Sequence, residues 1–354
     1  MAKIETSAFL ERLIRPNIRA LEPYHSARET VQTGILLDAN ENPFLHERDG
    51  VVLNRYPDPF QRELRTKLAG WTGVEPDQLL AGNGSDEVID WIFKVFCEPG
   101  LDAVAIPEPT YGMYRVMAHI FGVEVQDFLL TEDFQFDDQH FLTSVRPEVK
   151  ALFLCSPNNP TGNLLDTDSI LRVLQDWNGI VVLDEAYIDF ADRPSLVSRV
   201  HEFPGLIVLR TFSKAYGRAA LRLGFAVANH AVIELFLKVK APYNLNAVTL
   251  REGIRALQHQ VRYREEIEKI VSERRRVAAA LAQLPGVNRV HASDANFLLF
   301  ECRRASDVYQ RLFEKGIVVR NRSSLPLLSG CIRVSIGTEQ ENNIFLQELE
   351  KELK

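Results

Sequence analysis

The sequence predicts an α/β fold with a large domain, in which a mostly parallel sheet lies between helices, and a smaller α+β domain. Two observations predict this arrangement. Between about residues 78 and 230, short apolar segments alternate with helix-length segments, and Pro, Gly, Asn, Asp or Ser follows each apolar segment. Strands of a parallel sheet have this composition because helices cover both faces of the sheet. Beyond residue 247, long helices come first, and strands with amphipathic helices follow.

The strands expected in the large domain are short and mostly apolar. They are residues 103–106, 123–125, 151–155, 180–183 and 206–210, with a further strand before a glycine-rich turn at 82–84. Ligands of open α/β sheets bind at the carboxyl ends of the strands. Because chemically distinctive polar residues follow several of these ends, the sequence places the functional site there.

The chain is expected to divide into three parts. Residues 1–40 show few strand patterns and should form an N-terminal arm that packs on the smaller domain or on a partner subunit. Residues 41–246 should form the large domain and residues 247–354 the smaller one. In the smaller domain, one or two helices over 247–284 end at Pro285-Gly286. The later elements are strands at 296–300, 317–320 and 331–336 and helices at 305–315 and 339–353.

Composition and charge exclude several classes of protein. The chain has 354 residues and a net charge of −7, which argues against nucleic-acid binding. No segment has the pattern of a signal peptide, and none approaches the roughly 18 uninterrupted apolar residues of a membrane span. The four cysteines are far apart and lack C-x-x-C spacing, so we expect neither a metal site nor a disulfide framework. A reducing, cytoplasmic setting fits this cysteine usage.

Four residues that follow predicted strands carry the chemistry: Asn158, Asp184, Tyr187 and Lys214. A lysine that can lose its proton can bond to an aldehyde, and a buried carboxylate can pair with a protonated ring nitrogen. Tyrosine and asparagine side chains can donate hydrogen bonds to an anionic ring oxygen. Together, in this order, these groups are what a pyridoxal phosphate (PLP) enzyme needs.

Each of these residues also has an ordinary explanation. Lys214 alone would be taken as a solvated loop lysine, and Asp184 as a helix cap or part of an ion pair. Magnesium ligation by Asp184 is a further alternative, but no G-x-x-x-x-G-K-[ST] motif accompanies it. Asn158 lies in a segment of turn formers, and an isolated Tyr187 would be a core or rim tyrosine. The combination favours PLP.

A phosphate-binding turn is predicted where a strand, glycines and a helix start follow one another. Gly84, Ser85 and Asp86 stand at this helix start, where backbone N–H groups bind phosphate well. Ser213 and Arg222, on either side of the turn after Lys214, would complete the site.

Two further residues have a functional and a structural interpretation. Tyr111 follows a predicted strand and would stack on a cofactor ring or pack in the core. Arg333 lies between apolar neighbours in a strand, where it would face solvent or hold a substrate carboxylate through its planar fork.

With these motifs the chain resembles the fold-type I PLP-dependent aminotransferases, and among them the histidinol-phosphate aminotransferases. The resemblance covers nearly the whole chain. Its motifs are Pro23-Tyr24, Asn40-Glu41-Asn42-Pro43, Arg55-Tyr56-Pro57-Asp58-Pro59, Gly82-Asn83-Gly84-Ser85-Asp86-Glu87, Ser156-Pro157-Asn158-Asn159-Pro160-Thr161-Gly162, Asp184-Glu185-Ala186-Tyr187, the segment around Lys214, and the later Arg320 and Arg333.

The resemblance implies a PLP-dependent transferase fold and an amino-group transfer between L-histidinol phosphate and 2-oxoglutarate. It implies a homodimer with shared sites, in which Tyr56 reaches the PLP phosphate of the neighbouring subunit. Arg333 would bind the α-carboxylate of glutamate. The substrate-binding residues it implies are Tyr24, Asn40, Asn158, Arg320 and Arg333, and the phosphate would be held by Ser85, Asp86, Ser213 and Arg222.

One segment departs from the family pattern. After Gly217 the family commonly has Leu-Ala-Gly, whereas this chain has Arg218-Ala219-Ala220. Since Lys214 and Arg222 keep their spacing, the departure bears on loop geometry and substrate preference.

Three alternatives to this function stay open at the level of sequence. The same fold could act on aromatic amino acids or decarboxylate a phosphorylated amino acid. A PLP-domain regulator would carry a DNA-binding segment, and no helix-turn-helix pattern or basic segment is visible. A phosphate-binding module without PLP chemistry is the third.

Overall fold

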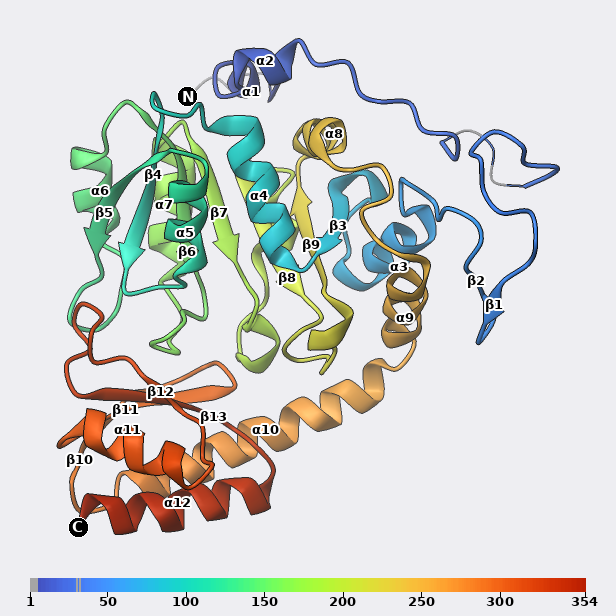
Figure 1. The fold of residues 1–354 in the computed structure, drawn as a ribbon. Helices are drawn as coiled ribbons and strands as arrows, with labels where there is room; N and C mark the ends of the chain where they lie inside the picture. The colour runs from blue at the N-terminus through green and yellow to red at the C-terminus, as the bar shows by residue number, and fades with distance from the viewer. Residues whose placement is uncertain (1–5, 30, 32) are drawn as a thin grey trace.

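The computed structural model describes residues 6–29, 31 and 33–354, and it has two domains that meet along one end of a central sheet (Figure 1). The predicted α/β large domain and α+β smaller domain are both present. Within the described part of the chain, no helix combines the length and apolar character needed to cross a membrane.

The large domain is built on a seven-stranded sheet in the order β3-β9-β8-β7-β6-β4-β5. Six strands run parallel to one another, and β9 is antiparallel to both of its neighbours. The carboxyl ends of the six therefore lie along one edge of the sheet. The strands are β3 (Leu79–Asn83), β4 (Ala103–Glu108), β5 (Glu124–Leu129), β6 (Val149–Cys155), β7 (Ile180–Asp184), β8 (Leu206–Thr211) and β9 (Leu223–Ala228).

Two layers of helices cover this sheet, and alternate residues of each strand contribute to two separate hydrophobic clusters. One face packs on α1 (Thr6–Glu11), α2 (Pro16–Arg19), α4 (Ser85–Phe96), α5 (Met113–Ile120) and α8 (His230–Val239). The other packs on α3 (Arg62–Thr72), α6 (Asp138–Ser144), α7 (Thr167–Asp176), α9 (Ala247–Leu257) and the start of α10. Short 3-10 helices lie in the connections: η1 (Pro76–Gln78), η2 (Ile188–Phe190), η3 (Leu196–Arg199) and η4 (Ala219–Leu221).

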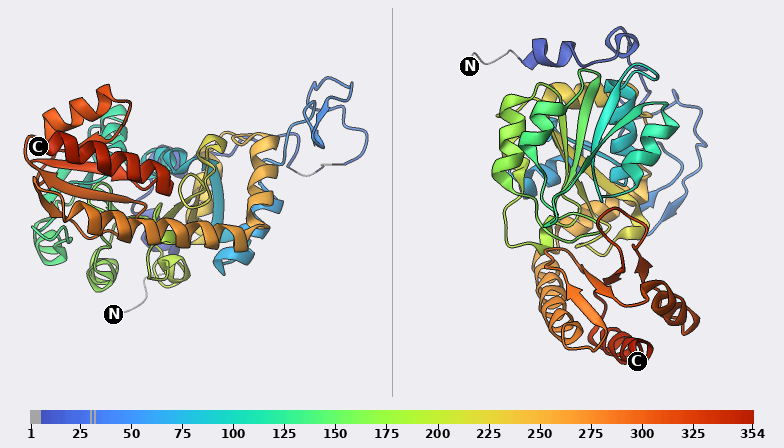
Figure 2. Two further views of the ribbon diagram at one scale, coloured as in Figure 1. Left: turned by 90° about the horizontal axis from the view of Figure 1, so that it is seen from below. Right: turned by 90° about the vertical axis from the view of Figure 1, so that its left-hand side faces the viewer.

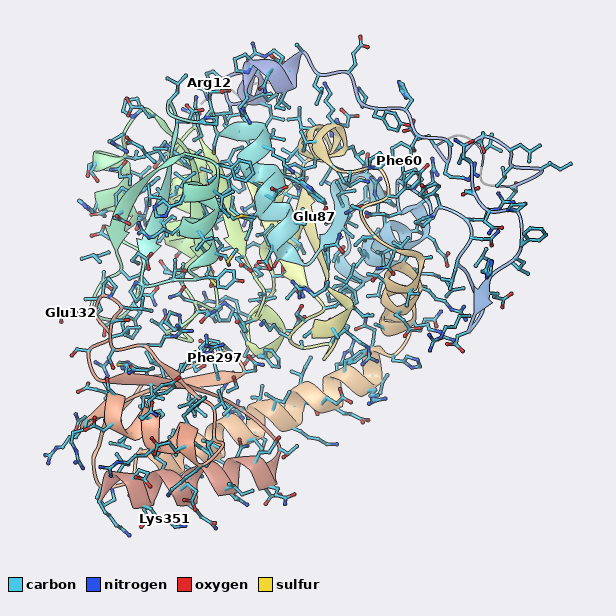
Figure 3. All side chains as sticks on the ribbon, viewed as in Figure 1. Arg12, Phe60, Glu87, Glu132, Phe297 and Lys351 are labelled. Atoms are coloured by element: carbon cyan, nitrogen blue, oxygen red, sulfur yellow. The ribbon has the colours of Figure 1, made fainter. Side chains whose placement is uncertain are left out.

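The smaller domain has an antiparallel four-stranded sheet in the order β10-β11-β13-β12. One face packs on helices through a third hydrophobic cluster, and the other face turns toward the large domain, where Phe297 lies (Figure 3). Its elements are α10 (Gln260–Leu281), β10 (Val287–Val290), β11 (Phe297–Cys302), α11 (Ala305–Glu314), β12 (Arg320–Asn321), β13 (Cys331–Ser335) and α12 (Glu339–Leu353).

The structure divides the chain differently from the expected boundaries. Helix α9 was assigned to the smaller domain, but it packs on α3 of the large domain, so the division falls at the start of α10. The first part of the N-terminal arm does not reach the smaller domain, because α1 and α2 bury apolar side chains beside α8 at the opposite end of the sheet. Residues 33–56, with β1 (Glu47–Arg48) and β2 (Val51–Val52), extend away from the body, so the N-terminal arm continues beyond its expected end at residue 40 (Figure 2).

Candidate active site

A cavity of about 670 Å³ lies where the carboxyl ends of the parallel strands face the sheet of the smaller domain. Residues from the ends of β4, β6, β7 and β8 line it from one side, and residues of β12, β13 and the loop between them line it from the other. Eleven of the residues predicted from the sequence lie in its wall: Gly84, Ser85, Asp86, Tyr111, Asp184, Tyr187, Ser213, Lys214, Arg222, Arg320 and Arg333.

Lys214 lies in the turn after β8, and its Nζ is 5.6 Å from the centroid of the Tyr187 ring. The residue remains accessible because the cavity is open, yet desolvation within it lowers the pKa of Lys214, and the positive charge of Arg333 lowers it further. Both effects favour the neutral amine, which is the nucleophilic form.

Asp184 closes the floor of the cavity at the end of β7 and is only 3% exposed. Its Oδ2 accepts a hydrogen bond from Tyr114 Oη at 2.7 Å, and its Oδ1 accepts one from the backbone N–H of Ala186 at 3.0 Å. Burial raises the pKa of Asp184 to about 6 despite these donors. A buried carboxylate with this penalty is stabilised by a cationic partner, such as a protonated ring nitrogen.

The asparagine that lines the cavity is Asn159 and not the predicted Asn158. Asn158 is 2% exposed, and its amide is already bonded to Thr110 Oγ1, Thr161 Oγ1 and the carbonyl of Pro109. Asn159 lines the cavity, donates to Tyr187 Oη at 3.4 Å and accepts a hydrogen bond from Arg333. The structure therefore does not place Asn158 where it could hold a ring oxygen or substrate.

The predicted phosphate-binding turn has the close approach of backbone that a phosphate site requires. Gly84 has a φ of +76°, and a Cβ at this residue would lie 2.5 Å from Arg222 Nη2. Arg222 extends across the start of α4, 3.5 Å from Ser213 Oγ and 3.4 Å from Asp86 Oδ2. The N-terminus of α4, whose first N–H groups lack partners within the helix, therefore lies beside this guanidinium.

Tyr111 forms part of the same wall. Its hydroxyl donates to Asp86 Oδ1 at 3.2 Å, and its ring meets that of Tyr114 edge to face at 5.5 Å. The ring is held between α4 and α5 and borders the cavity, as a stacking residue should.

The residues that depart from the family pattern do not disturb the site. The guanidinium of Arg218 lies 5.8 Å from the ring centroid of Tyr263 on α10, and its backbone N–H donates to Phe212 O at 3.0 Å. The charged group of Arg218 therefore lies against α10. Of Arg218-Ala219-Ala220, only Ala219 lines the cavity.

Three predicted residues of the N-terminal arm lie outside this chain's own cavity. Tyr24 is 75% exposed, Asn40 is also exposed, and Tyr56 is 49% exposed and stacks on Tyr243 with ring centroids 4.4 Å apart. The almost fully shielded side chain of Glu41 fixes this region, since it accepts hydrogen bonds from Arg28, Arg55 and the backbone N–H of Tyr56.

Sequence reasoning did not single out Asn159 and Arg322, which line the cavity. It also passed over Tyr114, which donates a hydrogen bond to Asp184, and Glu41, which fixes the region around Tyr56 outside the cavity. Tyr114 follows Tyr111 by three residues and lies in the first turn of α5, where its ring meets that of Tyr111 edge to face. Asn159 stands beside the residue that was chosen, and Arg322 lies two residues after Arg320. The fold shows that Asn159 and Arg322 line the cavity, whereas Tyr114 lies behind Asp184.

The cavity fits PLP. It contains the Lys214 amine, whose pKa is lowered, and the Asp184 carboxylate, which is buried and would be stabilised by a cation. The hydrogen-bond donors Asn159 and Tyr187 and the phosphate-binding turn at Gly84 complete it. The fold and this site together define a PLP-dependent enzyme of fold type I.

Comparisons with known proteins agree. The family "Aminotransferase class I and II" matches residues 27–349. The histidinol-phosphate aminotransferase of Christiangramia forsetii is 44% identical over 350 residues, which cover 97% of this chain and 99% of that protein. The crystal structure of histidinol-phosphate aminotransferase from Sinorhizobium meliloti in complex with pyridoxal-5'-phosphate is similar with a TM-score of 0.78 and 25% identity, covering 84% of this chain and 83% of the other. A decarboxylase from Sulfurospirillum multivorans has a TM-score of 0.75 and 28% identity, over 85% and 80% of the two chains.

The chain belongs to the class I and II aminotransferases, and within them to the histidinol-phosphate aminotransferase family. Its cofactor is PLP.

Proposed function

We propose that this enzyme transfers an amino group between L-histidinol phosphate and 2-oxoglutarate, giving imidazole acetol phosphate and L-glutamate, a step of histidine biosynthesis. The observation that carries the proposal is the group of arginines Arg320, Arg322 and Arg333, which faces Lys214 across the cavity. Both amino donors are anionic next to the reacting carbon, through a phosphate in one and a carboxylate in the other. An arginine presents the same planar fork to either anion.

The residues of the cavity then have distinct roles. When bound, PLP takes up the electrons left at the substrate α-carbon. Lys214 would remove the proton from that carbon as a general base and deliver it to the cofactor carbon as a general acid, and it would move the proton in the opposite direction in the second half-reaction. Asp184 holds the proton on the ring nitrogen, while Asn159 and Tyr187 donate to the ring oxygen in the role expected of Asn158 and Tyr187. Ser85, Asp86, Ser213 and Arg222 bind the phosphate, Ser85 and Asp86 partly through backbone N–H groups.

We also propose a homodimer in which the N-terminal arm completes the partner's site. Exposed apolar side chains are concentrated between residues 21 and 56, among them Ile35 at 93% and Leu37 at 85%. Such a surface is typical of an interface between subunits. In a dimer, Tyr24, Asn40 and Tyr56 would lie beside the neighbouring cavity. The four cysteines are buried free thiols, and on this ground we place the enzyme in the cytoplasm.

A panel of amino donors tests the proposed reaction. Purified, PLP-loaded enzyme should transfer the amino group of L-histidinol phosphate to 2-oxoglutarate with a higher kcat/KM than it shows for phenylalanine or tyrosine. Release of carbon dioxide from a phosphorylated amino acid would identify a decarboxylase instead. A clear preference for aromatic amino acids would overturn the proposed substrate.

Arg333→Ala should slow the half-reactions of both glutamate and histidinol phosphate. The activation free energy of each should rise by roughly 1.5–3 kcal/mol, because a charged hydrogen bond to each anion is lost. Arg333→Lys should recover only part, since the fork geometry is missing. Single-turnover kinetics, followed through the absorbance of the bound PLP, measure each half-reaction. If Arg333 had only a structural place in β13, the activation free energy of each half-reaction would change by no more than about 0.5 kcal/mol. A change that small would show that Arg333 does not bind the substrate.

A further inference from the structure

The wall that the smaller domain contributes to the cavity carries three arginines close together. Arg320 on β12 and Arg333 on β13 are register partners in adjacent antiparallel strands, and Arg322 follows directly after β12. All three line the cavity. Burial lowers the pKa of Arg322 and of Arg333, and the positive charge of Arg320 lowers both further, as that of Arg322 does for Arg333.

No acidic side chain of the cavity neutralises this group. Among the described residues, none of the three arginines takes part in an ion pair. The acids that line the cavity are held elsewhere: Asp86 accepts hydrogen bonds from Arg222 and Tyr111, Glu108 from Arg115, and Asp184 from Tyr114. The wall is therefore matched to a ligand that brings more than one negative charge.

Arg322 is the member of this group that the sequence did not single out. Its backbone N–H donates to Cys331 O at 2.9 Å, which fixes the start of the side chain against β13. Its Nε is buried and, like the Nε of Arg333, meets no hydrogen-bond acceptor in the described part of the chain. Burial of an N–H group without a partner costs free energy, so such a group inside a binding cavity points to an acceptor on the ligand.

We infer that Arg322 binds the phosphate group of the phosphorylated amino donor and sets the preference for that donor over amino acids with a single carboxylate. The inference rests on the proposed function. Arg333, which already donates to Asn159, would balance the one charge that a carboxylate and a phosphate have in common. A phosphate monoester carries nearly two negative charges at neutral pH. The second charge requires a second guanidinium, and Arg322 is suited to supply it because its unpartnered Nε is buried at the cavity, whereas Arg320 is exposed.

The test compares Arg322→Gln and Arg322→Lys with Arg289→Gln. Arg289 is an exposed residue of β10, at the opposite edge of the same sheet, so its substitution removes the same charge far from the cavity. The substrates are L-histidinol phosphate and L-histidinol, which differ only in the phosphate. For Arg322→Gln we expect kcat/KM to fall about 10- to 100-fold with the phosphorylated donor and to change less than about twofold with the other. Arg322→Lys should recover part of the loss, and Arg289→Gln should match the wild type.

Two results would overturn the inference: an equal loss with both donors, which indicates a structural role, or no loss with either. The absorbance of bound PLP and the midpoint of thermal unfolding report whether the variants fold. If wild-type enzyme does not use L-histidinol phosphate at all, the proposed function fails, and inhibition by inorganic phosphate decides the inference separately. Phosphate should inhibit the glutamate half-reaction of the wild type and of Arg289→Gln, and Arg322→Gln should relieve this inhibition; equal inhibition of all three would refute the role of Arg322.

Discussion

Asp184→Asn should have opposite effects on catalysis and on the stability of the protein freed of PLP. In the loaded enzyme, a neutral amide cannot hold the proton on the ring nitrogen. Loss of one partner of a buried charge pair costs roughly 3–5 kcal/mol, so kcat should fall by about two to four decades. In the PLP-free protein, the same substitution removes a buried charge that forms no ion pair with the described residues, and it should stabilise the fold.

The pKa of Asp184 gives the pH dependence of this stabilisation. The folded-state pKa is raised from 3.8 to about 6, so the carboxyl group contributes to stability while it is protonated, and that contribution is lost as pH rises through about 6. The shift corresponds to roughly 3 kcal/mol above pH 7. Urea unfolding of PLP-free protein should show Asp184→Asn more stable than wild type by about this amount at pH 8 and by roughly half of it at pH 5.

The exposed Asp133 provides the control, since Asp133→Asn should change neither rate nor stability. Near wild-type turnover of Asp184→Asn would remove Asp184 from its proposed role. A stability difference that is the same at both pH values would show that the carboxylate is not penalised by burial.

The parts of the fold that could be predicted from the sequence are those encoded locally. The strands at 103–106, 151–155, 180–183 and 206–210 were confirmed as β4, β6, β7 and β8, because apolar runs followed by turn residues identify buried parallel strands without further context. The expected strand at 317–320 is shorter and later, as β12 (Arg320–Asn321). Strand β9 was not predicted, although it pairs with the preceding β8, and its place beside β3 depends on pairing across more than a hundred residues of sequence.

The elements that depend on distant packing were misjudged for the same reason. Helices α1 and α2 have only six and four residues, too few to be stable alone, and they exist because apolar residues such as Leu10 and Ile14 pack beside α8. The boundary between the domains was placed too early because the sequence between α9 and α10, Gln258-His259, has no glycine or proline to mark a break.

Site residues could be predicted where the residue type has few ordinary structural roles at its position in the chain. A lysine directly after a buried strand and an aspartate at the end of another stand out, and the structure places both in the cavity wall. Asn158 and Asn159 cannot be distinguished by composition, because the hydrogen bonds of Thr110 and Pro109, about fifty residues earlier in the chain, decide which amide is already satisfied. The structure of a single chain does not assign Tyr24, Asn40 and Tyr56 to a site, because in the proposed dimer they contact the cavity of the neighbouring subunit.

Mixing two inactive variants should restore activity if the arm completes the partner's site. Lys214→Ala removes the amine of its own cavity, and Tyr56→Ala removes a side chain that lies outside its own cavity and is half exposed. In a mixed dimer, one site then carries both defects and the other carries neither. Random exchange between equal amounts makes about half of the dimers mixed, so about a quarter of all sites should become intact.

The matched control is a mixture of Lys214→Ala with Asp184→Asn. Both residues line the cavity of their own chain, so every site in the mixed dimer keeps one defect and activity should stay near that of Asp184→Asn alone. Differently tagged protomers, recovered together, show that exchange has taken place. If exchange occurs and the Tyr56→Ala mixture remains inactive, Tyr56 acts within its own subunit, and the arm must fold back onto its own cavity. Recovery in the first mixture but not in the second would instead assign Tyr56 to the neighbouring site, since only a residue supplied in trans can be separated from Lys214 in this way.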